Sequence, residues 1–152
     1  MWWQLERAGR CKKVKNWGYI LLMPGRPKVV EQKRSLSALG VDVSEKGTAW
    51  TDRITKAKRH RSAGRMQLDE RNALLVAAQP GDRVVVCDPT CLGVSAQDAA
   101  WFIERLAARG VVLIVNGNLR QVGPGEDASE LIADVARLIR NANTARSRGK
   151  SE

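Results

Sequence analysis

The chain has 152 residues, 43% of them hydrophobic, and a formal net charge of +10. This length fits one domain with a core of its own. No apolar run is long enough to span a membrane, and the first residues lack the apolar stretch of a secretory signal. We therefore expect no membrane contact and a cytoplasmic location.

The positive charge is concentrated in two segments. Residues 1–34 carry nine Lys or Arg against two acidic residues, and residues 45–65 carry seven against two. Such blocks suit a polyanion, most simply nucleic acid. A basic surface that only keeps the chain in solution would give the same composition. An anionic membrane is disfavoured, because neither block forms an amphipathic helical stripe.

The first quarter of the chain predicts an arm, a strand and a helix. Residues 1–16 are predicted to form a basic arm. The apolar run from Trp17 to Met23 predicts the first strand, which ends at Pro24-Gly25. Pro27 suits the first position of a helix, and Gly40 suits its end. The predicted stripe along one face of this helix is Val29, Val30, Lys33, Leu36 and Leu39.

The next elements are a short strand, a long loop and a second helix. Val41–Val43 is predicted as the second strand. The segment from Glu45 to Arg65 has no clear periodicity and is predicted as a mobile loop. Met66–Ala78 is predicted as a helix whose buried side is formed by Leu68, Leu74, Leu75 and Ala78.

The segment from Gln79 to Val115 predicts a strand–helix–strand unit. A turn at Pro80-Gly81-Asp82 precedes a β-branched strand over residues 84–86. Ser95 is predicted as the N-cap of the helix, with Asp98 in the capping-box position, and Gly110 as its end. A second strand follows over residues 111–115. The predicted buried face of the helix is Ala99, Phe102, Ile103 and Leu106.

The last quarter predicts a turn-rich loop over residues 116–125 and a long helix over residues 128–148. Its apolar stripe is formed by Leu131, Ile132, Val135, Leu138 and Ile139. The alternation of strands and helices predicts an α/β fold, with an open, mostly parallel sheet of about four strands, helices on both faces and a long C-terminal helix. We divide the chain into an arm (1–16), an α/β domain (17–125) and a helical tail (126–152).

The residue order PGD-x-VVV, LG-x-S and ARGV in this unit resembles the catalytic domain of resolvase/invertase-type serine recombinases. The resemblance spans roughly Tyr19 to Val115 and is weak in identity. It also includes EQKRSLSALGV and MQLDERNALLVAAQPGD as the first two helices. It implies a recombinase fold whose long helix mediates dimerisation and carries basic residues over DNA.

The resemblance also implies where catalytic residues would stand. In this family a serine at the end of the first strand attacks the DNA phosphodiester, and arginines from that strand and a later loop stabilise the phosphate. Tyr19 matches the tyrosine of the first strand. Leu21 stands at the arginine position, and Met23 stands at the nucleophile position. A methionine has no nucleophilic oxygen, and a leucine makes no bidentate phosphate contact.

The later loop departs from the family pattern as well. Thr90 stands at the aspartate position, and Cys91 and Val94 stand at the two arginine positions. Phosphoryl transfer depends on cations around the phosphate oxygens. We therefore expect no catalytic residue and no strand cleavage, and a shifted nucleophile is the minor alternative.

The three cysteines are Cys11, Cys87 and Cys91. Because no second Cys or His pair stands at ligand spacing, we expect no metal site, and we expect no cofactor. Cys91 as a substitute nucleophile is disfavoured, because Asp88 close by in the sequence would raise the pKa of its thiol.

The sequence thus predicts a serine-recombinase-like protein that binds double-stranded DNA, is linked to DNA recombination and lacks strand cleavage. A homodimer through the C-terminal helix, or a mixed oligomer with an active recombinase, is expected. The stripe Leu131, Val135 and Leu138 would pack on its own sheet or on a partner copy. The alternative is a protein-interaction or oligomerisation module without DNA chemistry. The predicted DNA contacts are Lys12, Lys13, Lys15, Arg53, Lys56, Lys58, Arg59, Arg61, Arg137, Arg140 and Arg146.

Overall fold

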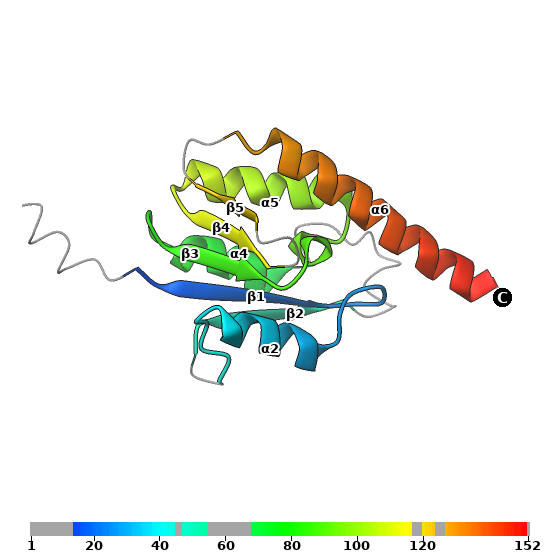
Figure 1. Ribbon diagram of the computed structural model, residues 1–152, viewed down its shortest axis with the longest axis horizontal. Helices are drawn as coiled ribbons and strands as arrows, with labels where there is room; N and C mark the ends of the chain where they lie inside the picture. Colours follow the sequence, from blue (N-terminus) through cyan, green and yellow to red (C-terminus); the bar gives the residue numbers. More distant parts are fainter. Residues whose placement is uncertain (1–13, 45–46, 55–67, 117–119, 124–126, 152) are drawn as a thin grey trace, which may run out of the picture.

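The computed structural model describes residues 14–44, 47–54, 68–116, 120–123 and 127–151. Among these residues lies a five-stranded sheet of order β2-β1-β3-β4-β5 (Figure 1). Neighbouring strands among the first four are parallel, and β5 is antiparallel to β4. The predicted open, mostly parallel sheet is therefore confirmed. The strands are β1 (Asn16–Leu22), β2 (Ala49–Arg53), β3 (Arg83–Val86), β4 (Val112–Val115) and β5 (Arg120–Val122).

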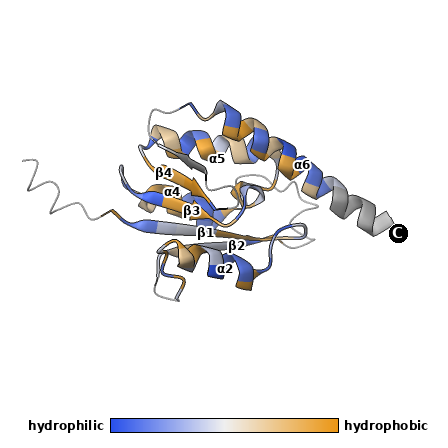
Figure 2. Cartoon of the chain, viewed as in Figure 1, coloured by the Kyte–Doolittle hydropathy of each residue, from blue (hydrophilic) through white to orange (hydrophobic). Residues whose placement is uncertain are grey.

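Helices cover both faces of the sheet, as predicted. Because side chains alternate along a strand, Tyr19 and Leu21 of β1 pack in one core with helices α4 and α5, whereas Ile20 packs with Leu36 of α2 in a second core. In Figure 2 the hydrophobic colour covers β4, most of β3 and the later half of β1, and the helices show both colours. The helical elements are α2 (Val29–Ala38), α4 (Asp69–Ala77), the 3₁₀ turn η2 (Pro89–Leu92), α5 (Ala96–Ala108) and α6 (Ser129–Ser151).

The long C-terminal helix is confirmed, and its apolar stripe is buried within the chain. Leu131, Val135 and Ile139 are at most 4% exposed and belong to the larger core. Helix α6 lies against helix α5 and the turn η2. Figure 1 shows α6 crossing α5 and continuing beyond the body of the sheet.

Among the described residues, no helix is both long and apolar enough to cross a membrane.

Two helices end in the same way, which corrects one predicted strand. Gly40 and Gly110 have φ angles of 88° and 76°, and the N–H group of the next valine donates to the carbonyl of a residue in the last turn. This is a Schellman motif, in which the residue after the glycine makes a hydrophobic contact back to the helix. Val41 is therefore the apolar closure of α2, and the strand predicted at residues 41–43 is wrong.

The second strand lies instead in the segment predicted as a loop. Residues Ala49–Arg53 pair in parallel with β1, and Asp52 is 6% exposed. An edge strand with only one ladder needs no apolar periodicity, which is why the sequence pattern missed it. The predicted loop over residues 116–125 is wrong in the same respect, since it contains the short edge strand β5.

Helix α2 begins later than predicted and turns a different face inward. It starts at Val29, so Pro27 precedes the helix. The buried residues are Gln32 and Leu36, whereas Val30 is 61% exposed and Lys33 is also exposed. The Gln32 side chain bonds the backbone N–H and carbonyl of Leu21, at 3.2 and 2.9 Å. These hydrogen bonds hold a polar residue at a position that an apolar pattern cannot identify.

The turn before β3 is fixed by Asp82, which is 5% exposed. Its carboxylate accepts hydrogen bonds from the Trp17 indole at 2.9 Å and from the backbone N–H of Gln79 at 2.9 Å. Burial alone would raise the pKa of this carboxyl, but these hydrogen bonds and one from Lys15 N–H lower it overall. The residue order PGD therefore encodes a link between the amino ends of β1 and β3.

Candidate functional site at the carboxyl edge of the sheet

The sheet changes its direction of winding between β1 and β3. The chain goes from β1 to β2 on one side, and then crosses to β3 on the other side of β1. In open α/β sheets, ligands bind outside the carboxyl ends of the strands at such a switch point. The residues that follow β1 and β3, from Met23 to Arg26 and from Cys87 to Val94, meet here and include every non-matching recombinase position except Leu21.

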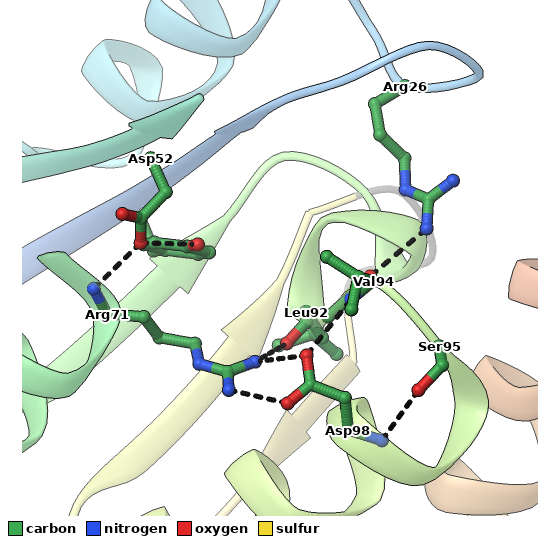
Figure 3. A network of polar contacts seen from close by, with 9 residues as sticks. Arg26, Asp52, Arg71, Leu92, Val94, Ser95 and Asp98 are labelled. Atoms are coloured by element: carbon green, nitrogen blue, oxygen red, sulfur yellow. Dashed lines mark hydrogen bonds and ion pairs between the residues drawn. The ribbon is translucent and has the colours of Figure 1, made fainter. Parts of the chain in front are cut away.

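Arg26 fills this switch point. It is 9% exposed, and its guanidinium reaches the carbonyl of Thr90 at 2.6 Å, the carbonyl of Gly93 at 3.1 Å and the side-chain oxygen of Asn143 at 3.1 Å. Figure 3 shows Arg26 pointing toward the loop beside Val94. These three acceptors lie in η2, in the turn after it and in α6. Burial lowers the pKa of Arg26. Its donors are committed to protein acceptors, so Arg26 joins three segments and is not directed at a ligand.

The positions at which the sequence departs from the recombinase pattern are mostly packed. Leu21 and Cys91 are fully buried, and Val94 is 6% exposed. Met23 is half-buried and packs against the larger core. A phosphate group could not reach Leu21, Cys91 or Val94 without displacing apolar side chains and the Arg26 contacts, whereas Met23 lies at the margin of this packed region.

Burial disfavours the reactive thiolate form of Cys91, a cause that the sequence captured only in part. Burial is the main cause that raises the pKa of Cys91 to about 12, and Asp88 adds to it. Asp88 itself accepts hydrogen bonds from the N–H and hydroxyl of Thr90, at 3.2 and 2.5 Å. The predicted rise in the pKa of Cys91 is confirmed, and burial contributes more to it than the charge of Asp88 that the sequence suggested.

We expect iodoacetamide to spare Cys91 in the folded chain. At pH 8 a thiol with a pKa of about 12 is ionised roughly a thousand times less than a free cysteine, and only the thiolate reacts. Peptide mass mapping after timed alkylation measures this directly, with the urea-unfolded chain as control. Labelling of Cys91 in the folded chain as fast as in urea would contradict the packing described here.

A buried ion pair holds the loop from the inside. The guanidinium of Arg71, which is fully buried, pairs with the carboxylate of Asp98 at 2.7 Å and also donates to the carbonyl of Leu92 at 3.0 Å (Figure 3). The other Asp98 oxygen accepts the N–H of Val94 at 3.0 Å. Ser95 is confirmed as the N-cap, accepting the N–H of Asp98 at 3.1 Å. The Asp98 carboxylate, however, binds Arg71 and Val94 instead of closing a reciprocal capping box.

The glycine of the LG-x-S sequence has a steric role. A Cβ atom on Gly93 would lie 2.6 Å from the backbone nitrogen of Ala99 and 2.9 Å from an Asp98 oxygen. Only a residue without a side chain lets the loop approach the first turn of α5 this closely. The match to the recombinase pattern at this position therefore reflects packing.

A second buried carboxylate positions helix α4. Asp52 of β2 accepts the Tyr19 hydroxyl at 2.9 Å and the N–H groups of Glu70 and Arg71 at 3.1 and 2.9 Å. It therefore caps the first turn of α4 and fixes the position of Arg71 within that turn. Burial, followed by the Asp52 charge, raises the pKa of Tyr19. The matching tyrosine of the first strand is thus a structural hydrogen-bond donor.

Beside this packed region lies an open cavity of about 410 Å³. Lys28 and Arg53, both exposed, provide its charge together with the buried Arg26, and no carboxylate is among its described lining residues. Its apolar wall includes Met23 and Ile54. This cavity shares Met23, Pro24 and Arg26 with the switch point, and it is the part of the carboxyl edge that is open to an anion.

Five of the eleven predicted DNA contacts have a described backbone. Lys15 precedes β1 at the amino edge, and Arg53 ends β2 at the carboxyl edge. Arg137 and Arg140 are exposed on α6, and Arg146 lies in the same helix. The structure therefore places Lys15 apart from Arg53. The remaining predicted contacts fall outside the described residues: Lys12, Lys13, Lys56, Lys58, Arg59 and Arg61.

Three important residues were missed in the sequence. Arg26 follows a Pro-Gly turn, Asp52 is an isolated acid in a basic segment, and Arg71 is one of many arginines. The sequence offered one signal for two of them: Asp52 is an acid within a basic segment, and Arg71 is a charged residue within a helix predicted to be buried on one side. Nothing in the local sequence indicates the residues with which they pair.

No known protein family matches the chain, and no curated protein is significantly similar to it.

Proposed function

We propose that this chain is a serine-recombinase-like protein that binds double-stranded DNA and does not cleave it. The proposal is carried by one observation: the cavity at the carboxyl edge keeps two exposed cations, Lys28 and Arg53, while the side chain at the nucleophile position, Met23, lines the same cavity. Such a site attracts a phosphate by charge and offers it no nucleophile at that position.

The long helix supplies a second basic surface. Arg137 and Arg140 are exposed on α6, whose residue Asn143 binds Arg26 beside the cavity. The ion pair of Arg137 with Asp134, at 3.8 Å on the surface, is too weak to neutralise it in water. Together with the two basic segments of the sequence, these groups support contacts to the DNA backbone rather than to base edges.

The proposal includes the expected partners and location. A homodimer, or a mixed oligomer with an active recombinase, would form through α6, and a cytoplasmic location would give access to DNA. The stripe that includes Leu131 and Val135 is used within the chain, so a partner would contact the half-buried Leu138 and the exposed residues of α6. Light scattering of the free chain measures the homodimer.

The DNA proposal is tested by fluorescence anisotropy with a labelled 30-base-pair duplex across a salt series. We expect binding to weaken steeply between 50 and 200 mM salt, because each neutralised phosphate releases counterions. The double variants Lys28→Ala/Arg53→Ala and Arg137→Ala/Arg140→Ala should each weaken binding and lower the salt slope by about 2. The matched control is Arg34→Ala/Arg83→Ala, which removes two exposed arginines away from the cavity.

Two results would sink the proposal. One is no binding at low salt. The other is an equal loss of affinity in the control, which would mean that only the net charge matters. Incubation with supercoiled plasmid and a trap for covalent adducts tests cleavage separately. We expect no nicking from the natural chain or from Met23→Ser, since the later loop still lacks the arginines that stabilise the phosphate.

A further inference from the structure

We propose that a groove between α4 and α5 is a docking site for an acidic segment of a partner protein, anchored by one large apolar side chain. The groove has a volume of about 320 Å³ and is open to solvent. It is lined by residues 72–76 of α4 and by residues from the middle of α5 to just past its end, at positions 101–109. This site is independent of the DNA contacts proposed above.

The groove combines an apolar floor with an exposed apolar rim. Leu75 is 7% exposed and forms part of the floor, and the half-buried Trp101 forms the wall on α5. Val76 on the rim is 75% exposed, the highest value among the large hydrophobic residues that the structure describes. Isolated exposed valines are common, but this one borders a cavity with an aromatic wall, which suits a buried anchor side chain.

The charge of the groove points to an acidic occupant. Arg105 and Arg109 line it, and no carboxylate is among its described lining residues. The Arg105 guanidinium lies 5.4 Å from the centre of the Trp101 ring, and Arg109 donates to the carbonyl of Ala78 at 2.9 Å. Both cations are thus held in place at the apolar surface, where an opposing carboxylate would be favoured.

A protein segment fits the groove better than a nucleic-acid base. Two guanidinium groups, of Arg71 and Arg105, already lie 5.5 and 5.4 Å from the centre of the Trp101 ring. A base would have to displace one of these contacts in order to stack there. The apolar floor instead suits an aliphatic or aromatic side chain from a peptide.

The location of the groove allows both partners to bind together. Helices α4 and α5 end at Ala77 and Ala108, before the strands β3 and β4 begin. The groove therefore lies toward the amino edge of the sheet, whereas Lys28 and Arg53 lie at the carboxyl edge. A partner docked in the groove would not cover the cavity proposed to receive DNA.

The test selects peptides from a random 12-residue display library on the full chain, and then measures their affinities in solution. We expect enriched peptides to contain Asp or Glu around one large apolar residue. Val76→Asp and Arg105→Glu should each weaken their binding at least about tenfold. The matched controls are Val30→Asp and Arg34→Glu, which place the same charges at exposed positions of α2 on the other face of the sheet.

The outcomes separate this site from DNA binding. If the natural chain binds DNA, unchanged duplex affinity in Val76→Asp together with lost peptide binding supports the groove. If it does not bind DNA, lost peptide binding in Val76→Asp with unaffected α2 controls supports it. The proposal is overturned if the selected peptides are neutral or basic, if the α2 controls weaken them equally, or if duplex DNA competes with them for the natural chain.

Discussion

Replacing Asp98 with alanine is expected to lower the free energy of unfolding by about 3–5 kcal/mol. The substitution leaves the fully buried Arg71 guanidinium without the carboxylate of Asp98, and it leaves the Val94 N–H without its acceptor. Few single substitutions in this chain would cost as much, because a buried unpaired charge is penalised far more than a lost surface contact. Urea unfolding followed by circular dichroism measures the change.

Two variants on the same helix calibrate this result. Ser95→Ala removes only the N-cap and should cost about 1 kcal/mol, whereas the exposed Glu104→Ala should change stability by less than about 0.5 kcal/mol. Replacing both ion-pair partners, as in Arg71→Met/Asp98→Leu, should recover much of the loss, because no unpaired charge remains. A cost for Asp98→Ala no larger than that of Ser95→Ala would show that Arg71 is not buried as described.

Replacing Arg26 with methionine is expected to loosen the carboxyl edge while the rest of the fold remains. The carbonyls of Thr90 and Gly93 would lose their donor, and each buried acceptor left unsatisfied costs about 1–3 kcal/mol. The link to Asn143 of α6 would also be lost. Hydrogen exchange should therefore become faster in η2 and in the part of α6 around residue 143, and much less so in β3 and β4.

The alkylation of Cys91 provides an independent readout of the same change. If Arg26 holds η2 in place, Arg26→Met should expose the Cys91 thiol and raise its labelling rate well above that of the natural chain. The matched control is Lys28→Met, which also replaces a cationic side chain with methionine, but at an exposed position two residues away. Exchange in α6 and labelling of Cys91 that both stay at the natural level would show that Arg26 does not join these segments.

Much of the fold could be read from local patterns. The apolar strand at residues 84–86 and the face containing Phe102 and Leu106 were predicted correctly, because burial on a regular element repeats with the period of that element. Strand β2 was missed, since at the sheet edge it is defined by its ladder to β1 and by the buried Asp52. The strand prediction at Val41–Val43 is wrong because a Schellman motif, like the start of a strand, places an apolar residue after a glycine.

For the candidate site, the sequence predicted only which catalytic groups are not present. The sequence showed that Met23, Cys91 and Val94 lack the chemistry of a phosphoryl-transfer site. It did not show what replaces that chemistry. Arg26 bonds residues 64, 67 and 117 positions away, and no periodicity carries information over such separations.

The sequence by itself determined the alternation of strands and helices, the capped start of α5 and the absence of a nucleophilic oxygen at Met23. These features depend on residue type and on spacing within one element. Only the tertiary structure decided how the buried cations are paired, Arg71 with Asp98 and Arg26 with carbonyl groups. It also decided that the exposed Lys28 and Arg53 line one cavity. The physical reason is that pairing and exposure depend on the order of the strands, which brings distant segments of the chain to one edge of the sheet.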